Sequence, residues 1–370
     1  MKYFIIAGEK SGDLHGGNLA KELKTQDASA VMQGWGGSEM QSAGVNLLQD
    51  YSELAFMGLD FLKSFGRIRR LFIDCKKQIL SLEPDVLILI DYSGFNLRIA
   101  KWAKNNNIKV VYYIAPKTWA WNASRNKSIK KFVDRLLVIL PFEEAYFNEH
   151  GIKALYVGNP LVERINAFVP DTAFKSTIPE GYNSIVALLP GSRKKEIERV
   201  SEELKKVARQ FKHTLFIVAA ISEVNQALYN CFECIPNAIL VFDKTYDILS
   251  VADAAIVTSG TATLETALFN VPQIVVYKAD KLTYFIGSRM VKIKHISLVN
   301  LILDDFAVPE LIQHEFNSGM IKSHLKELLF DTKKKEKQLD NYNKLKLILG
   351  EQKASKSAAV SVLEFLKSEQ

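Results

Sequence analysis

The stretch that decides the fold is AGEKSGDLHGG, residues 7–17. It follows a short apolar run, residues 3–7, and leads into residues 14–23, which can form a helix. Its four glycines permit positive φ angles or a close approach to the backbone: Gly8, Gly12, Gly16 and Gly17. The sequence therefore predicts a strand-turn-helix unit whose helix start can hold an anion. The alternative is a tight turn that only lets the helix pack on the strand.

The glycine spacing excludes two common phosphate-binding loops. The dinucleotide fingerprint has its first two glycines two residues apart, whereas Gly8 and Gly12 are four apart. A P-loop closes on Gly-Lys-Ser/Thr, and no such triplet follows here.

Length and composition predict a two-domain globular protein. The chain has 370 residues, more than a single core usually serves, and 48% of them are hydrophobic. No apolar run reaches the ~18 residues of a membrane span, and no signal-peptide pattern precedes the first strand, so we expect a cytosolic protein.

Three cysteines do not suggest a disulfide framework. Cys231 and Cys234 form a lone C-x-x-C without a second ligand pair, which we interpret as structural.

The formal charge of +7 is unevenly distributed. Residues 1–165 hold 22 Lys and Arg against 17 Asp and Glu. A basic half predicts an anionic partner, which could be nucleic acid, anionic lipid or a phosphorylated substrate.

Apolar runs of strand length alternate with stretches of helical length in both halves of the chain. In the first half strands are expected at 3–7, 86–90, 110–114, 136–140 and 155–157. In the second half they are expected at 185–189, 215–219, 239–242, 255–257 and 274–276. This rhythm predicts two doubly wound α/β domains with parallel sheets, whose carboxyl ends share a cleft. We place the first domain at 1–165, a Pro- and Gly-containing linker at 166–183, and the second domain at 184–345.

Asp91 directly follows the apolar strand VLILI. A carboxylate at the end of such a strand is partly desolvated, which raises its pKa and suits it to general-base catalysis. The alternative is an N-cap for a helix that begins near Asn96.

Two tryptophans follow the next strand, in PKTWAW at residues 116–121. If this segment is extended, Trp119 and Trp121 point to the same side. On a loop at the carboxyl end of a strand, paired indoles are expected to wall a pocket.

Two helix starts in the second half are expected to bind a diphosphate. LLPGSR places Gly191, Ser192 and Arg193 between a strand and a helix, where amides and a guanidinium can bind phosphate. The stretch SGTATLE offers a second set of small donors: Ser259, Gly260, Thr261, Ala262 and Thr263. Glu265 follows in the first turns of that helix and can bind a ribose diol.

The chain contains no Asp-x-Asp pair, which metal-dependent glycosyltransferases use to hold a divalent ion. The sequence therefore predicts no metal and no cofactor. Charge on a leaving diphosphate is expected to be stabilised by helix N-termini and cations instead.

Residues 54–80 combine apolar residues at helical spacing with several cations. A basic amphipathic helix of this kind can lie on an anionic membrane. The expected membrane contacts are Leu59, Phe61, Leu62, Phe65, Arg67, Arg69 and Arg70. The alternative is an ordinary helix whose later turns pack on the sheet.

Together, these segments resemble the lipid-A-disaccharide synthase family, glycosyltransferase family 19. The resemblance runs from residue 7 to about residue 301 and is carried by AGEKSGD, GWGGSEMQSAG, ELAFMGL, GRIRRL, PDVLILID, FN, P-x-x-WAW, LPFE, VGNPL, LLPGSR, SGTATLE and SLVNL. It implies a GT-B fold, UDP-2,3-diacylglucosamine as donor and 2,3-diacylglucosamine 1-phosphate (lipid X) as acceptor. It also implies an inverting transfer that forms a β-1,6-linked disaccharide and UDP at the cytoplasmic face of the inner membrane of a Gram-negative bacterium.

The resemblance also implies roles for individual residues. Asp91 becomes the base, with Glu9 or His15 as alternatives, while Arg193 and residues 259–263 become the diphosphate site. Glu265 becomes the ribose ligand and Asn300 a candidate at the donor sugar. The acceptor is then expected at Gly8, Ser11, Gly12, Asn96, Trp119 and Trp121. GT-B chains often return their last helix to the first domain, so residues 346–370 are placed there.

The chain departs from the family pattern at three places. Where members have I-D-A-P-D-F-N, residues 90–96 read IDYSGFN, so only the first aspartate remains. Lys117 and Thr118 replace smaller or apolar residues, and Val299 replaces a proline. These changes bear on acyl-chain preference and loop shape, and not on the type of reaction.

Two other functions remain open. A UDP-N-acetylglucosamine 2-epimerase would share the fold, although it needs no lipid surface. A nucleotide sensor or nucleic-acid-binding protein would use the basic first half, but the sequence contains no recognised nucleic-acid motif. A homodimer is possible, and the sequence does not specify the oligomeric state.

Overall fold

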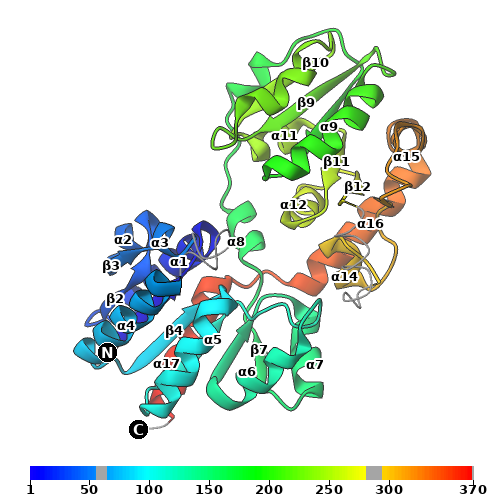
Figure 1. Ribbon diagram of the computed structural model, residues 1–370. Helices are drawn as coiled ribbons and strands as arrows, with labels where there is room; N and C mark the ends of the chain where they lie inside the picture. The colour runs from blue at the N-terminus through cyan, green and yellow to red at the C-terminus, as the bar shows by residue number, and fades with distance from the viewer. Residues whose placement is uncertain (56–64, 281–293, 369–370) are drawn as a thin grey trace. The chain divides into compact units, whose positions relative to one another are not determined.

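The computed structural model describes residues 1–55, 65–280 and 294–368. The chain divides into two compact units, one formed by residues 1–163 and 351–370 and the other by residues 164–350 (Figure 1). The chain therefore passes between the units twice. None of the helices in the described part of the chain combines the length and the apolar character that crossing a bilayer requires.

The first unit contains a seven-stranded parallel sheet in the order β3-β2-β1-β4-β5-β6-β7. Its strands are β1 (Lys2–Ala7), β2 (Val31–Gly36), β3 (Asn46–Asp50), β4 (Val86–Ile90), β5 (Val110–Tyr113), β6 (Arg135–Val138) and β7 (Ala154–Tyr156). Its helices are α1 (Lys10–Gln26), α2 (Ser38–Ser42), α3 (Ser52–Ala55), α4 (Phe65–Leu82), α5 (Ser93–Asn105), α6 (Asn126–Phe132), α7 (Pro141–Glu149) and α17 (Ala354–Lys367), and α8 (Pro160–Asn166) leads into the second unit.

Successive residues of the central strands pack on opposite faces of this sheet. Ile5 joins a core that includes α1 and α17, whereas Ile6 joins a core that includes α4, α5 and α7. The C-terminal helix thus covers the same face as the first helix (Figure 1). Its first turn is tied to α8, because Ser355 donates to the Glu163 carboxylate from its backbone N (3.1 Å) and its Oγ (2.5 Å).

The second unit repeats this plan with six parallel strands in the order β10-β9-β8-β11-β12-β13. Its strands are β8 (Ser184–Leu189), β9 (Thr214–Ala220), β10 (Ala238–Phe242), β11 (Ala254–Thr258), β12 (Gln273–Tyr277) and β13 (Glu310–Ile312). Its helices are α9 (Lys194–Ala208), α10 (Asn230–Glu233), α11 (Thr245–Val251), α12 (Thr261–Leu268), α14 (Leu298–Leu303), α15 (Ser318–Phe330) and α16 (Thr332–Leu349). Both strand orders are those of Rossmann-like doubly wound sheets, as the sequence predicted.

All ten expected strands are present, but the sequence missed β2, β3 and β13. Strand β2 contains Gly34 and Gly36, which weaken any strand signal. Strand β3 lies at the sheet edge with no fully buried residue, and β13 has only three residues.

Element boundaries also differ from those expected. Helix α1 begins at Lys10 and not at Leu14, so the turn after β1 is only two residues long. The expected linker contains Phe174, which is buried in the core of the second unit. Helix α16 continues to Leu349, and the chain returns to the first unit only after Gly350.

Helix α4 packs its apolar stripe on the sheet. Ile68, Leu71, Cys75 and Ile79 are all buried, so the structure supports the packing alternative for these turns. Leu59, Phe61 and Leu62 lie outside the described residues, and so does the side chain of Phe65.

Candidate active site

The candidate site of the first unit lies where its strand order reverses, between β1 and β4. Ligands of doubly wound sheets bind at the carboxyl ends of the strands beside such a reversal. The loops after these two strands touch, because a Cβ on Gly8 would lie 2.4 Å from a ring carbon of Tyr92. Gly8 therefore allows the two loops to approach each other.

Asp91 is the first residue after β4 and adopts a left-handed backbone conformation, with φ 46°. Its backbone is held on both sides, since its N donates to the Tyr113 carbonyl (3.1 Å) and its carbonyl accepts from Asn96 Nδ2 (2.9 Å) and Tyr112 Oη. Burial raises the pKa of the Asp91 carboxyl, and the positive charge of Lys117 opposes this rise. The carboxyl group thus has the environment that the sequence predicted for a base.

Asn96 supports Asp91 from within helix α5. Its side chain is fully buried, and its Nδ2 donates to the carbonyls of Ile90 (3.1 Å) and Asp91 (2.9 Å). Asn96 Nδ2 therefore fixes the end of β4, and the expected contact of Asn96 with the acceptor stays a prediction.

The start of α1 combines exposed and buried residues. Glu9 and Ser11 are exposed, whereas Gly12 is buried, with its Cβ position 3.4 Å from the Cβ of Ala7. Burial and, secondarily, the charge of Glu9 raise the pKa of Tyr92, so Glu9 lies near the Asp91 loop. The close approach at Gly12 supports the packing of α1 on the sheet, and its expected role at the acceptor stays a prediction.

Gly8 and Gly12 offer a matched pair of substitutions. Gly8→Ala is expected to lower the free energy of unfolding by about 1–3 kcal/mol, because its methyl group would overlap Tyr92. Gly12→Ala is expected to change it by less than about 1 kcal/mol, because its methyl group meets Ala7 at an ordinary contact distance and α1 gains an alanine. Urea denaturation measures both values. Equal stability of the two variants would contradict the close approach of the loops at Gly8.

Asp13 organises the loop after β2 and was not singled out from the sequence. It is 3% exposed and accepts hydrogen bonds from the backbone N–H groups of Gly37 (2.7 Å), Glu39 (3.1 Å) and Met40 (3.1 Å). Its carboxylate therefore holds the start of α2. An acidic residue inside a Gly-rich helix was the only sequence signal.

The two tryptophans have different environments, and the extended conformation on which their expected common direction depended is not found. Residues 118–120 form a turn and are not extended. Trp119 Nε1 donates to Glu143 Oε1 at 2.9 Å. Trp121 is 50% exposed and stacks under the Arg125 guanidinium at 4.6 Å, and Arg125 Nη1 donates to Ser93 Oγ at 2.6 Å. Trp121 is thus tied to the start of α5, close to Asp91 in sequence.

Glu143 is a buried carboxyl group at the start of α7. It is 1% exposed, and besides Trp119 it accepts hydrogen bonds from the backbone N–H groups of Ile139 (3.2 Å) and Leu140 (3.0 Å). Burial raises the pKa of Glu143 to about 7 against these three hydrogen bonds. The LPFE segment was the available signal, but burial of its glutamate is not visible in the sequence.

Lys117 is close enough to lower the pKa of both Asp91 and Glu143 through its charge. These residues follow β4, β5 and β6, which are neighbouring strands. The carboxyl edge of the first unit therefore gathers two carboxyl groups and one ammonium group.

A groove of about 320 Å³ lies between α4 and α5 of the same unit. Ile68 and Phe72 form its apolar part, and its cations come from Arg69, Lys76 and Arg98. Arg69 and Arg70 are exposed, while Arg67 forms an ion pair with Glu53.

In the second unit, the loop after β8 already holds an anion from its own chain. Glu196 Oε2 accepts hydrogen bonds from the backbone N–H groups of Ser192 (3.0 Å) and Arg193 (3.2 Å). Its Oε1 accepts one from Arg193 Nη1 (2.8 Å). Gly191 has φ 108°, and a Cβ there would lie 2.6 Å from Glu196 Oε2. The predicted anion-binding geometry is present, and a carboxylate fills it.

The loop after β11 differs from expectation in the use of its hydroxyl groups. Thr263 is fully buried, with its Oγ1 donating to the Gly260 carbonyl (2.8 Å) and accepting from Leu298 N (3.3 Å). Ser259 Oγ donates to the Ile296 carbonyl (2.8 Å). Gly260 and Thr261 are exposed, and no atom lies within 4 Å of the Cβ position of Gly260. The open part of this loop is therefore at Gly260 and Thr261.

Glu265 and Asn300 have different prospects as ligands. Glu265 is partly exposed and accepts a hydrogen bond from Tyr246 Oη at 2.6 Å. Asn300 is fully buried, and its Nδ2 donates to the Val308 carbonyl and Glu310 Oε1, both at 2.9 Å. Its Oδ1 accepts from Ala307 N and Val308 N, also at 2.9 Å. The Asn300 amide therefore joins α14 to the segment before β13, and its expected role at the donor sugar stays a prediction.

Cys231 and Cys234 are free thiols, as is the buried Cys75. Within the described ranges, no group of three or more His, Cys, Asp or Glu residues is arranged to hold a metal ion.

Two doubly wound parallel sheets with glycine-containing loops at their carboxyl edges define the GT-B class of fold. The chain is similar over 98% of its length to UDP-GlcNAc 2-epimerase from Neisseria meningitidis bound to UDP-GlcNAc, with TM-score 0.69, 12% identity and all of that chain covered. It is also similar to the glycotransferase of kitacinnamycin, with TM-score 0.65, 13% identity and coverage of 99% of this chain and 98% of that one. These low identities show the fold alone.

Comparison of sequences identifies the family. The family model described as lipid-A-disaccharide synthetase matches residues 3–364. The chain is 36% identical to lipid-A-disaccharide synthase from Geobacter metallireducens over 99% of this chain and 97% of the relative. It is 37% identical to the protein of the same name from Syntrophus aciditrophicus over 98% of this chain and 97% of the relative. The chain belongs to the lipid-A-disaccharide synthase family, the glycosyltransferases of lipid A biosynthesis.

Proposed function

We propose that this protein transfers 2,3-diacylglucosamine from UDP-2,3-diacylglucosamine to 2,3-diacylglucosamine 1-phosphate. The products are a β-1,6-linked disaccharide 1-phosphate and UDP, with inversion at the anomeric carbon. Membership of the family supports the reaction. The observation that supports the assignment in this chain is the raised pKa of the Asp91 carboxyl. Burial at the end of β4 raises this pKa, and the charge of Lys117 opposes the rise.

Asp91 is proposed as the general base. Its carboxylate takes the proton from the acceptor 6-hydroxyl as that oxygen attacks the anomeric carbon, and the bond to the UDP oxygen breaks on the opposite face. A raised pKa brings the base closer to the operating pH, which favours proton transfer. The side chains of Tyr112 and Asn96 donate to the Asp91 backbone carbonyl and so fix the residue that carries the carboxyl group.

The donor is proposed to bind in the second unit. Its diphosphate would contact the backbone N–H groups of the loop 191–193, the Arg193 side chain and the open loop at Gly260 and Thr261, with Ala262 behind it at the helix start. Glu265 is proposed to bind the ribose diol, next to the Tyr246 hydroxyl. Because Glu196 occupies the amides of Ser192 and Arg193, the diphosphate must displace that carboxylate. Helix N-termini and Arg193 then stabilise the leaving charge without a metal.

The acceptor is proposed to bind in the first unit. Its 1-phosphate would contact the start of α1 through the exposed Ser11, while Gly8 and Gly12 shape the turn behind it. Trp121 is partly exposed on the loop after β5, and it is proposed to contact the sugar or an acyl chain.

The first unit is also proposed to contact the inner membrane from its cytoplasmic side. The exposed Arg69 and Arg70, and the groove with Arg69, Lys76 and Arg98, supply cations, and the described residues that line the groove include no carboxylate. Cations of this kind attract anionic headgroups.

The proposed reaction is tested by measuring UDP release from UDP-2,3-diacylglucosamine in detergent, with and without the monosaccharide 1-phosphate. UDP release that depends on the acceptor supports the transferase. The epimerase alternative predicts interconversion of two sugar nucleotides without UDP release. UDP release that is independent of the acceptor would contradict the proposed acceptor.

A further inference from the structure

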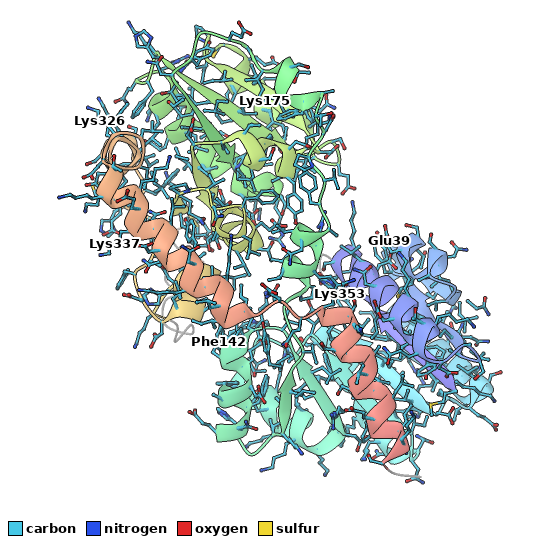
Figure 2. All side chains as sticks on the ribbon, turned by 180° about the vertical axis from the view of Figure 1, so that it is seen from behind. Glu39, Phe142, Lys175, Lys326, Lys337 and Lys353 are labelled. Atoms are coloured by element: carbon cyan, nitrogen blue, oxygen red, sulfur yellow. The ribbon has the colours of Figure 1, made fainter. Side chains whose placement is uncertain are left out.

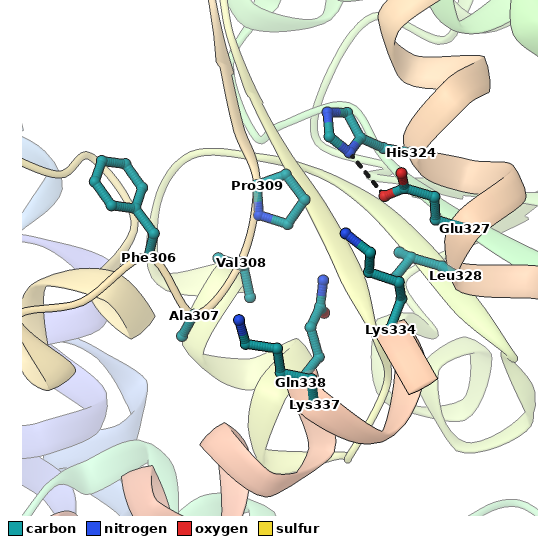
Figure 3. Close-up of a pocket in the computed structure, with 10 residues that line it drawn as sticks. All are labelled: Phe306, Ala307, Val308, Pro309, His324, Glu327, Leu328, Lys334, Lys337 and Gln338. Atoms are coloured by element: carbon teal, nitrogen blue, oxygen red, sulfur yellow. Dashed lines mark ion pairs between the residues drawn. The ribbon is translucent and has the colours of Figure 1, made fainter. Parts of the chain in front are cut away.

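A pocket of about 220 Å³ lies in the second unit, away from the proposed donor loops. It is formed by residues 306–309, α15 and α16 (Figure 3). Val275 N donates to the Pro309 carbonyl at 2.9 Å, so this segment lies at the amino end of β13. The donor loops follow the carboxyl ends of β8 and β11 in the same parallel sheet. The pocket is therefore at the opposite edge of the sheet and is not part of the donor site.

The inner part of the pocket is apolar. Ala307, Val308 and Leu328 are all less than 6% exposed. The amide of Gln338 is already used, because its Oε1 accepts from Gln273 N (2.9 Å) and Tyr342 Oη (2.9 Å), and its Nε2 donates to the Gln273 carbonyl (3.2 Å). Apolar atoms of a ligand therefore suit this part of the pocket.

The mouth of the pocket is cationic. Lys334 and Lys337 are exposed and extend from α16 toward residues 306–309 (Figure 3), and Figure 2 shows Lys337 on the same helix from behind. Neither ammonium group has an ion-pair or hydrogen-bond partner among the residues that the structure describes. Glu327 also lines the pocket, with its Oε2 3.5 Å from His324 Nδ1, so the two lysines exceed the lining carboxylate by one charge.

Phe306 adds an exposed aromatic ring beside these cations. Its side chain is 74% exposed. The ring packs edge-on against the buried His295 ring, with 4.6 Å between the centroids. An aromatic ring held at the surface beside lysines is typical of a contact with the interfacial region of a membrane.

We propose that this pocket binds an anionic phospholipid at a membrane surface. The acyl chain would insert a segment against Ala307, Val308 and Leu328, and the phosphate would lie between the two lysines. The pocket is smaller than the ~300–1,000 Å³ of a complete small-molecule site, so only part of the ligand is enclosed, as with a lipid that remains in its bilayer. A second copy of the chain is a less favourable partner on average, because its formal charge of +7 has the same sign as the two lysines. The second unit thus gains a lipid contact of its own, beyond the transfer reaction.

The test measures binding of the full chain to phosphatidylcholine vesicles with and without phosphatidylglycerol. Lys334→Gln combined with Lys337→Gln is expected to weaken binding to the anionic vesicles about 25-fold, which is roughly fivefold per lysine. The matched control is Lys333→Gln combined with Lys335→Gln, which removes the same charge from the same helix but not from the pocket. It is expected to weaken binding less than about threefold.

A second pair of variants tests the aromatic contact. Phe306→Ser is expected to weaken binding, whereas Phe330→Ser, at a side chain that is 72% exposed and does not line the pocket, is not. Equal losses in the two lysine variants, or in the two phenylalanine variants, would overturn the proposal in favour of diffuse attraction. A change of oligomeric state without vesicles, seen only in the pocket variants, would overturn it in favour of self-association.

A further control removes the contribution of the first unit to vesicle binding. The lysine comparison is repeated in a chain that carries Arg67→Gln, Arg69→Gln and Arg70→Gln. The 25-fold difference is expected to persist there, because the two sets of cations act independently. Its disappearance would overturn the proposal. UDP release from detergent-dispersed substrates is expected to be unchanged by the pocket variants, so failure of this proposal and failure of the proposed transfer give different results.

Discussion

Asp91→Asn is expected to lower kcat by about 10²–10⁴-fold, because an amide cannot accept the proton of the acceptor hydroxyl. Asparagine is the appropriate substitution, since Asn and Asp tolerate the left-handed backbone found here, with φ 46°, better than other residues. Acceptor-dependent UDP release measures the effect, and the free energy of unfolding checks that the variant is folded.

The controls for this prediction are the other candidate bases, Glu9 and His15. Glu9→Gln and His15→Gln are expected to lower kcat by only a few-fold. The pH profile of the wild type gives an independent check: because burial raises the pKa of Asp91, activity is expected to fall on the acid side as the base becomes protonated. Full activity of Asp91→Asn would place the base elsewhere, and a large loss in Glu9→Gln would identify it.

Glu143 is expected to make the stability of the protein depend on pH. Its pKa is about 7 in the folded protein, against 4.5 for an unperturbed glutamate. Between these values the folded protein holds a proton that the unfolded chain has lost, so the free energy of unfolding falls as pH rises through this window. The difference corresponds to roughly 3 kcal/mol. The groups that face Glu143 include Lys117, Trp119 and Tyr156.

The measurement is urea denaturation of the wild type and Glu143→Gln from pH 4 to pH 8. The wild type is expected to lose about 3 kcal/mol relative to the variant across this range. Glu144→Gln is the matched control on the same helix and is expected to follow the wild type. Parallel curves for the wild type and Glu143→Gln would contradict a raised pKa, and would mean that the three N–H donors outweigh burial.

The sequence predicted the fold well because the strands that form the centre of each sheet are strongly apolar. Val86–Ile90 is buried on both faces and has the expected bounds. The strands that were missed depend on their neighbours. Gly34 in β2 has no side chain to give a period of two, and a Cβ there would lie 1.9 Å from the Ile5 carbonyl oxygen. Such a residue is recognised as part of a strand only once its neighbour is in place.

For the candidate site, the sequence predicted the environment of some residues and not of others. Asp91 could be found because it comes directly after an apolar strand, which is visible in the sequence without any knowledge of distant segments. The sequence could not show whether Thr263 and Asn300 bind a ligand or bond within the unit. A hydroxyl or amide group suits either purpose, and in the structure these groups bond to Leu298 and Val308. Asp13 and Glu143 were missed because both carboxylates are buried by segments that are distant in the sequence. The sequence alone does not show that burial.

The Glu196 carboxylate gives the loop after β8 an internal occupant. If a nucleotide binds to this loop, its phosphate replaces the Glu196 carboxylate on the same N–H groups. At the proposed donor site, the cost of binding would include freeing Glu196 from its hydrogen bonds to Ser192 and Arg193.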